Sequence, residues 1–177
     1  MIPPDLLGAP MAAKKDRPGQ RRPTTGEAAT PRSGARSRAP WHLWPIAGVM
    51  LLLAGGGLWD YLNLIEPNTA YIEDQGWGAS GIAYFTDYPI VLRLLWTTAL
   101  LAAAAAPVLV LFRSRFAVPL ALVAAVAQAL LLVSTLAFMD RLAALGTFTA
   151  LFDAGVAIVF AAFWGYCRYL RARSALR

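Results

Sequence analysis

Cysteine and histidine are almost absent from this chain of 177 residues, and their scarcity excludes several kinds of site. The single cysteine, Cys167, cannot form a disulfide within the chain. One cysteine together with one histidine, His42, cannot supply the usual zinc ligand sets or a bis-histidine haem site. The sequence therefore predicts no metal site and no cofactor.

Charge is also sparse, and long apolar runs take its place. Charged residues make up 15% of the chain, against about 25% in a typical soluble domain, and hydrophobic residues make up 58%. The hydrophobic residues gather in four continuous runs at residues 45–64, 89–112, 116–139 and 147–166. Each run is about 20 residues or slightly longer, roughly what a helix needs to cross a ~30 Å hydrocarbon core. Because strands of a membrane barrel are shorter and alternate in polarity, the pattern predicts an all-α integral membrane protein.

Residues 1–40 form a separate region, followed by a transmembrane domain at residues 41–177. The first region is rich in Pro, Gly, Ala, Arg, Ser and Thr and has no hydrophobic period, which predicts a disordered basic tail. No short apolar segment with a cleavage site follows its basic residues, so we do not expect a signal peptide. The tail either lies on anionic lipid or is solvated and sets the topology. The sequence leaves open whether translation starts at Met1 or Met11.

The distribution of basic residues predicts the orientation in the membrane. Of the 16 basic residues, eight lie in the tail, two in the turn between the second and third runs, and four after the last run. The remaining two, Arg93 and Arg141, fall on the other side. The positive-inside rule then places both termini in the cytoplasm. We expect a multi-pass protein of a bacterial cytoplasmic (inner) membrane.

The connections between the runs predict an up-down four-helix bundle, because short connections join antiparallel neighbours. The exception is the outer loop at residues 65–88, in which residues 79–86 are expected to form a short helix on the membrane surface. Long loops in compact proteins are often functional. An external recognition surface, if there is one, is therefore predicted on the loop aromatics Trp77, Tyr84 and Tyr88.

Three charged residues fall inside the predicted spans. Asp60 lies near the outer end of the first span, Arg93 about one turn inside the second and Asp153 nearly two turns inside the fourth, counting at 1.5 Å per residue. Unpaired charges in lipid are costly, so we predict that Arg93 pairs with Asp60, Asp153 or both. The cluster either lines a cavity for a cation, a proton or a hydroxylated solute, or is a salt bridge that orders the bundle.

Gln128 is the one amide deep in a predicted span, and we expect it to make a polar contact between helices. No catalytic constellation is apparent. A Ser-His-Asp triad is excluded because His42 falls at the opposite membrane face from the acids. Phosphate-binding and dinucleotide-binding motifs are also missing. The sequence thus predicts that the protein is not an enzyme.

Five short stretches are informative when taken together: Trp59-Asp60-Tyr61, Ala83-Tyr84-Phe85, Tyr88-Pro89, residues 111–119 and Arg171-Ala172-Arg173. They resemble a largely uncharacterised family of small four-helix bacterial membrane proteins, some of which are labelled sugar transporters. The resemblance covers roughly residues 44–177 and omits the tail. It implies a four-helix membrane fold and supplies no catalytic residues.

Two classes of function follow from these observations. In the first, the protein is a small transporter or solute-binding protein, as a homo-oligomer, with Asp60, Arg93 and Asp153 holding the solute or a coupling ion. In the second, it is an accessory or assembly subunit that docks on a larger membrane complex through its small residues and outer loop. The lipid bilayer is a partner in either case. No nucleic-acid partner is expected, because the net charge of +6 comes from the ends of the chain.

Overall fold

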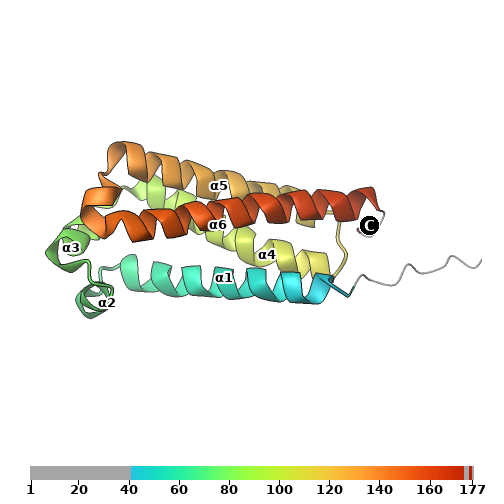
Figure 1. The fold of residues 1–177 in the computed structure, drawn as a ribbon, viewed down its shortest axis with the longest axis horizontal. Helices are drawn as coiled ribbons and strands as arrows, with labels where there is room; N and C mark the ends of the chain where they lie inside the picture. The colour runs from blue at the N-terminus through green and yellow to red at the C-terminus, as the bar shows by residue number, and fades with distance from the viewer. Residues whose placement is uncertain (1–40, 174–175, 177) are drawn as a thin grey trace, which may run out of the picture. The chain divides into compact units, whose positions relative to one another are not determined.

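The computed structural model of the protein describes residues 41–173 and residue 176. The predicted disordered tail at residues 1–40 lies outside the described residues. Within the described part every regular element is a helix (Figure 1). The helices are α1 (Leu43–Leu64), α2 (Thr69–Asp74), α3 (Gly78–Thr86), α4 (Ile90–Leu111), α5 (Ala117–Phe138) and α6 (Arg141–Ala172).

Four of these helices, α1, α4, α5 and α6, are long and apolar enough to cross a membrane. A helix of 22 residues, the length of α1, α4 and α5, is about 33 Å long, which matches a ~30 Å hydrocarbon core. Their outer faces carry large exposed hydrophobic side chains such as Leu52, Leu101 and Ile158. A soluble protein rarely exposes such a continuous apolar surface, and the surface suits the helices of a multi-pass membrane protein.

The long helices pack in a fixed order. α4 contacts α1 on one side and α5 on the other, and α5 contacts α6. α2 and α3 join α1 to α4 at one end (Figure 1). Alanine makes the contact between α4 and α5 close: Ala103 and Ala106 of α4 and Ala117 and Ala121 of α5 are all buried. Small residues let helix backbones approach where no hydrophobic force drives association.

α6 is two helical pieces in one element. Gly146 has φ 82° and ψ 164°, which is not helical and which favours glycine, and it separates a first turn from the long piece that begins at Thr147. Thr147 is also where the apolar pattern places the start of the last span. The residues before it, expected to be loop, instead form a helical turn that begins at Arg141.

The outer loop is folded into α2 and α3. α3 lies where the sequence predicts a short helix, whereas α2 was not predicted. The Asn68 side chain caps α2 by accepting a hydrogen bond from the Tyr71 backbone N–H at 3.3 Å. The loop packs through a hydrophobic cluster of its own, made of Leu64, Ile72, Tyr84, Phe85, Tyr88 and Leu145.

The outer-loop prediction needs a correction at its aromatic residues. Tyr84 and Tyr88 are buried, with 8% and 7% of their surface exposed, and Trp77 is half-buried. Tyr84 packs edge-on against Phe85, and Tyr88 stacks on the same ring. The two tyrosines thus close the end of the bundle and are not available to a docking protein. The tyrosines are buried because covering the ends of the helices removes a large aromatic surface from water, which stabilises the fold.

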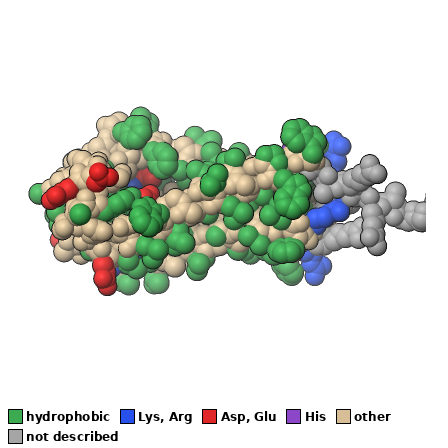
Figure 2. Space-filling view, turned by 90° about the horizontal axis from the view of Figure 1, so that it is seen from below, with side chains coloured by type: hydrophobic (Ala, Val, Ile, Leu, Met, Phe, Trp, Pro, Cys, Tyr) green, Lys and Arg blue, Asp and Glu red, His purple; other side chains and the backbone are tan. Residues whose placement is uncertain are grey.

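Opposite charges mark the two ends of the described bundle. Figure 2 shows acidic side chains gathered at the end formed by α2 and α3, whereas the basic side chains on this face lie mainly at the opposite end. Glu66, Glu73 and Asp74 belong to the first end, and Arg115, Arg168 and Arg171 to the second. The charge asymmetry read from the sequence is therefore present in the fold.

Candidate functional site

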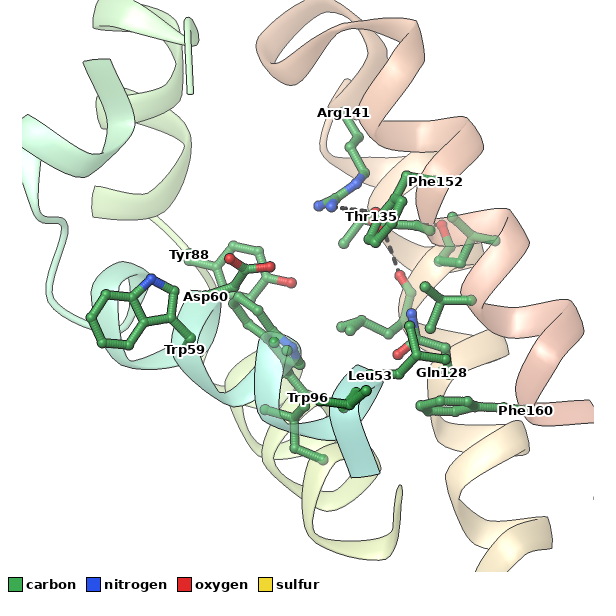
Figure 3. Close-up of a pocket in the computed structure, with 18 residues that line it drawn as sticks. Leu53, Trp59, Asp60, Tyr88, Trp96, Gln128, Thr135, Arg141, Phe152 and Phe160 are labelled. Carbon is green, nitrogen blue, oxygen red and sulfur yellow. Dashed lines mark hydrogen bonds and ion pairs between the residues drawn. The ribbon is translucent and has the colours of Figure 1, made fainter. Parts of the chain in front are cut away.

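The four long helices enclose a cavity of about 280 Å³ near the end covered by α2 and α3. α1 supplies one wall, α5 and α6 supply the opposite wall, and Trp96 and Leu100 reach in from α4 (Figure 3). The α1 wall borders open space, because a Cβ atom at Gly56 would meet nothing within 4 Å. The polar side chains of the lining are Asp60, Tyr88, Gln128, Thr135, Arg141 and Asp153.

Arg141 and Asp153 form an ion pair on the α6 side of the cavity. Their side chains are only 13% and 20% exposed. The Arg141 guanidinium also donates to the Tyr84 hydroxyl at 3.4 Å and lies 6.0 Å from the centre of that ring. Its Nε atom is buried without a hydrogen-bond partner. Removing two charges from solvent is expensive, so the pair depends on this close geometry.

The break at Gly146 is what lets these two residues meet. They are 12 residues apart in one element, which in an unbroken helix would separate them by about 18 Å along the axis. The break at Gly146 folds the first turn of α6 back over its long piece. Arg141 is thereby brought to the carboxylate of Asp153.

Asp60 lies on the α1 side, across the cavity from Arg141 (Figure 3). Its carboxylate accepts a hydrogen bond from the hydroxyl of Tyr71 in α2. Burial, and then the hydrogen bond to Asp60, raises the pKa of Tyr71 above its ordinary value, so Tyr71 stays a neutral donor. Among the described residues the Asp60 carboxylate has no ion-pair partner.

The predicted pairing of Arg93 with these acids is wrong. The Arg93 guanidinium donates to the backbone carbonyl of Phe85 at 3.4 Å, and Asp153 pairs with Arg141 instead. Phe85 belongs to the last turn of α3, where carbonyl groups lack helical partners and attract cations. Asp60 and Asp153 do both line the cavity, whereas Arg93 does not.

Gln128 lies on the cavity wall at half-burial. Over residues 41–173 and 176 its amide has no hydrogen-bond partner, so the predicted contact between helices is not formed there. Thr135, which lies further along α5, is by contrast satisfied within its own helix, because its hydroxyl donates to the Leu131 carbonyl at 2.9 Å. The Gln128 amide is therefore left facing the cavity as a free donor and acceptor.

Sequence reasoning missed Arg141 and Tyr71. Arg141 precedes the last apolar run, so the pattern assigns it to a loop, and Tyr71 lies within the predicted outer loop. One local signal was available for Arg141. Gly146 lies between this charged residue and the start of the last span, and such a glycine indicates a possible break in the backbone. No local pattern indicates that Tyr71 would reach Asp60, which is 11 residues away across a turn.

The formal charge of the cavity lining is one negative unit, from two carboxylates and one guanidinium. Burial raises the pKa of Tyr84 and of Tyr88, so these hydroxyls are neutral hydrogen-bonding groups. Among the described residues no group of His, Cys, Asp and Glu is arranged to hold a metal ion. Aromatic side chains complete the lining: Trp59, Trp96, Phe152 and Phe160.

Comparison of the chain with protein-family models, with curated proteins and with solved structures gives no match. The resemblance to small four-helix bacterial membrane proteins stays a prediction.

Proposed function

We propose that the protein spans a membrane four times as an up-down bundle and binds a small cationic solute in this cavity, as part of its transport. The observation that carries the proposal is a cavity of net negative charge inside helices apolar enough to lie in lipid. Charged residues in such helices mark ligand and ion sites by default. At about 280 Å³ the cavity is just below the usual range for drug-sized ligands, so the solute is small.

The two carboxylates have different roles in this proposal. Asp153 is neutralised by Arg141, whereas Asp60 is held only by the neutral hydroxyl of Tyr71. Asp60 is therefore the group that attracts a cation. Aromatic rings favour organic cations through their negative faces, and Trp96 and Tyr88 line the cavity on the Asp60 side. A hydroxylated solute such as a sugar is the runner-up, because Gln128 and Thr135 are also present.

The orientation of the bundle belongs to the same proposal. We propose that the end away from α2 and α3, and with it both termini, faces the cytoplasm of a bacterium. The arginines at that end support this orientation through the positive-inside rule. The cavity then lies in the outer half of the membrane. Because one small cavity cannot by itself form a pathway through the bundle, we propose that transport requires a homo-oligomer.

Calorimetric titration of the full chain in lipid nanodiscs tests the proposal. The titrants are tetramethylammonium, glucose and acetate, which represent a cation, a hydroxylated solute and an anion. We expect saturable binding of the cation, weakened about tenfold or more by Asp60→Asn, because a charge-assisted contact is worth about 1.5–3 kcal/mol. Asp87→Asn is the matched control, since Asp87 is exposed at the end of α3 and does not line the cavity.

Each alternative outcome has a definite meaning. Binding of glucose alone would show that the solute is hydroxylated and not cationic. Equal losses in Asp60→Asn and Asp87→Asn would show that surface charge, and not the cavity, attracts the ligand. Absence of binding by all three titrants would overturn the proposal.

The accessory-subunit hypothesis is the alternative proposal, and the structure weakens its basis. It assigns docking to the small residues and to the outer loop. Of the loop aromatics, Tyr84 and Tyr88 are buried and Trp77 is half-buried. Purification in mild detergent from the native membrane tests it. An equimolar partner that is lost on Trp77→Ala would favour docking, whereas a homo-oligomer alone favours the transporter.

A further inference from the structure

A second hollow lies between α5 and α6, near the end of the bundle away from α2 and α3. It is an open groove of about 630 Å³. Its α5 side is apolar, and its α6 side carries two arginines and a tryptophan. The residues that line it are Val118, Pro119, Leu122, Trp164, Arg168, Arg171 and Ala172.

The depth of these residues matches the layers of a membrane. The long piece of α6 begins at Thr147, and a hydrocarbon core of ~30 Å takes about 20 residues, which ends it near Tyr166. Trp164 then lies at the boundary, where tryptophan is preferred. Arg168 and Arg171 lie just beyond it, at the level of lipid phosphates.

The two arginines are placed to act together on one anion. They are three residues apart and so share a face of α6, and both are exposed. Arg168 lies over the Trp164 ring, 5.0 Å from its centre, which orients the guanidinium along the groove. The described lining of the groove holds no acidic side chain, so nothing there neutralises the positive charge.

We infer that this groove binds one anionic phospholipid. Arg168 and Arg171 contact the phosphate through charge-assisted hydrogen bonds, and an acyl chain lies along Val118 and Leu122. Basic pockets between membrane helices on the cytoplasmic side are suited to such headgroups. A second copy of the chain fits less well, because an identical face would bring like charges together. The inference does not depend on the solute cavity at the other end.

Native mass spectrometry of the full chain in mild detergent tests the inference. The probes are phosphatidylglycerol and phosphatidylcholine with identical acyl chains, and inorganic phosphate as a competitor. We expect phosphatidylglycerol to be retained in preference to phosphatidylcholine, with phosphate competing weakly because it lacks the acyl chains. Loss of one arginine should lower the retained fraction about fivefold, since a basic residue near an anionic lipid is worth roughly 1 kcal/mol.

Arg168→Gln and Arg173→Gln make a matched pair of variants. Each removes one charge and one arginine–ring contact, because Arg173 lies 4.9 Å from the centre of the Tyr169 ring. Arg173 does not line the groove, so only Arg168→Gln should release the lipid. Equal losses of bound lipid in the two variants would show that the net positive charge of this end, and not the groove, attracts the lipid. That result would overturn the inference.

Leu122→Trp provides a second test that leaves the charge unchanged. Leu122 is 40% exposed on the groove wall, so the larger side chain fills the groove without disturbing the core. We expect it to lower lipid retention as well. Undiminished retention in this variant would place the lipid elsewhere, and a dimer peak in place of the lipid adduct would assign the groove to a second copy.

Discussion

Arg141 controls the charge balance of the solute cavity. It neutralises Asp153, lies against the Tyr84 ring and leaves its own Nε atom without a partner. The carboxylate of Asp60 on the opposite wall is then the uncompensated charge. Arg141 thus gives the two acids different roles: Asp153 is held in an ion pair, and Asp60 is left to contact a ligand.

Asp153→Asn should destabilise the protein by about 3 kcal/mol or more, because it leaves the Arg141 guanidinium buried without its counter-charge. The double variant Arg141→Met, Asp153→Leu should recover most of that loss, since an apolar pair avoids the desolvation cost. Chemical unfolding in mild detergent measures both. If the double variant is no more stable than Asp153→Asn, the ion pair does not explain the loss.

At the scale of elements, the break in α6 and the loop helices build the site. Gly146 allows the first turn of α6 to fold back, and α2 brings Tyr71 to Asp60. α3 presents Tyr84 to Arg141 and the Phe85 carbonyl to Arg93. The long helices supply the walls of the cavity, and the short elements at their ends orient its charges.

Gly146→Ala should destabilise the protein by about 1–3 kcal/mol, because a φ of 82° with ψ 164° is essentially restricted to glycine. Gly155→Ala is the control, since Gly155 is helical, its Cβ position is open, and alanine favours helix by about 1 kcal/mol. Thermal unfolding of the two variants gives the comparison. A loss no larger in Gly146→Ala than in Gly155→Ala would contradict a structural role for the break.

At the scale of the whole molecule, charge and hydrophobicity are segregated along the bundle. Acids collect at the end that holds the solute cavity, and arginines collect at the end that holds the lipid groove. The middle is apolar on its outer surface. We propose that this arrangement orients the bundle in a membrane, with a cation attracted at one face and an anionic lipid at the other.

Cysteine labelling in intact cells tests the proposed orientation. Glu73→Cys, in α2, should react with an impermeant maleimide added outside, whereas Arg115→Cys, in the turn between α4 and α5, should react only after permeabilisation. Both positions are exposed, and the native Cys167 is buried, so the parent chain serves as the blank. The reverse labelling pattern would invert the topology.

Much of the helical framework was predictable because each helix depends mainly on its own residues. The four apolar runs place α1, α4 and α5 within two residues at each end and the start of the long piece of α6 at Thr147, but α6 continues to Ala172, beyond the predicted end at residue 166. The aromatic stretch at residues 79–86 predicts α3 in the same way. α2 was missed because it has only six residues. Its one sequence signal is the capping residue Asn68, and a single residue does not distinguish a helix start from a turn.

What the sequence alone determined is therefore local: helices long and apolar enough to cross a membrane, and an excess of positive charge at one end. Only the tertiary structure decided that Arg141 and not Arg93 meets Asp153, that Tyr71 holds Asp60, that Tyr84 and Tyr88 are buried and that Gln128 faces a cavity. Those contacts depend on which helix faces meet and on one backbone break. A count of residues along each helix predicts neither the contacting faces nor the break, because it gives the depth of a side chain in the membrane but not the side of the helix on which it lies.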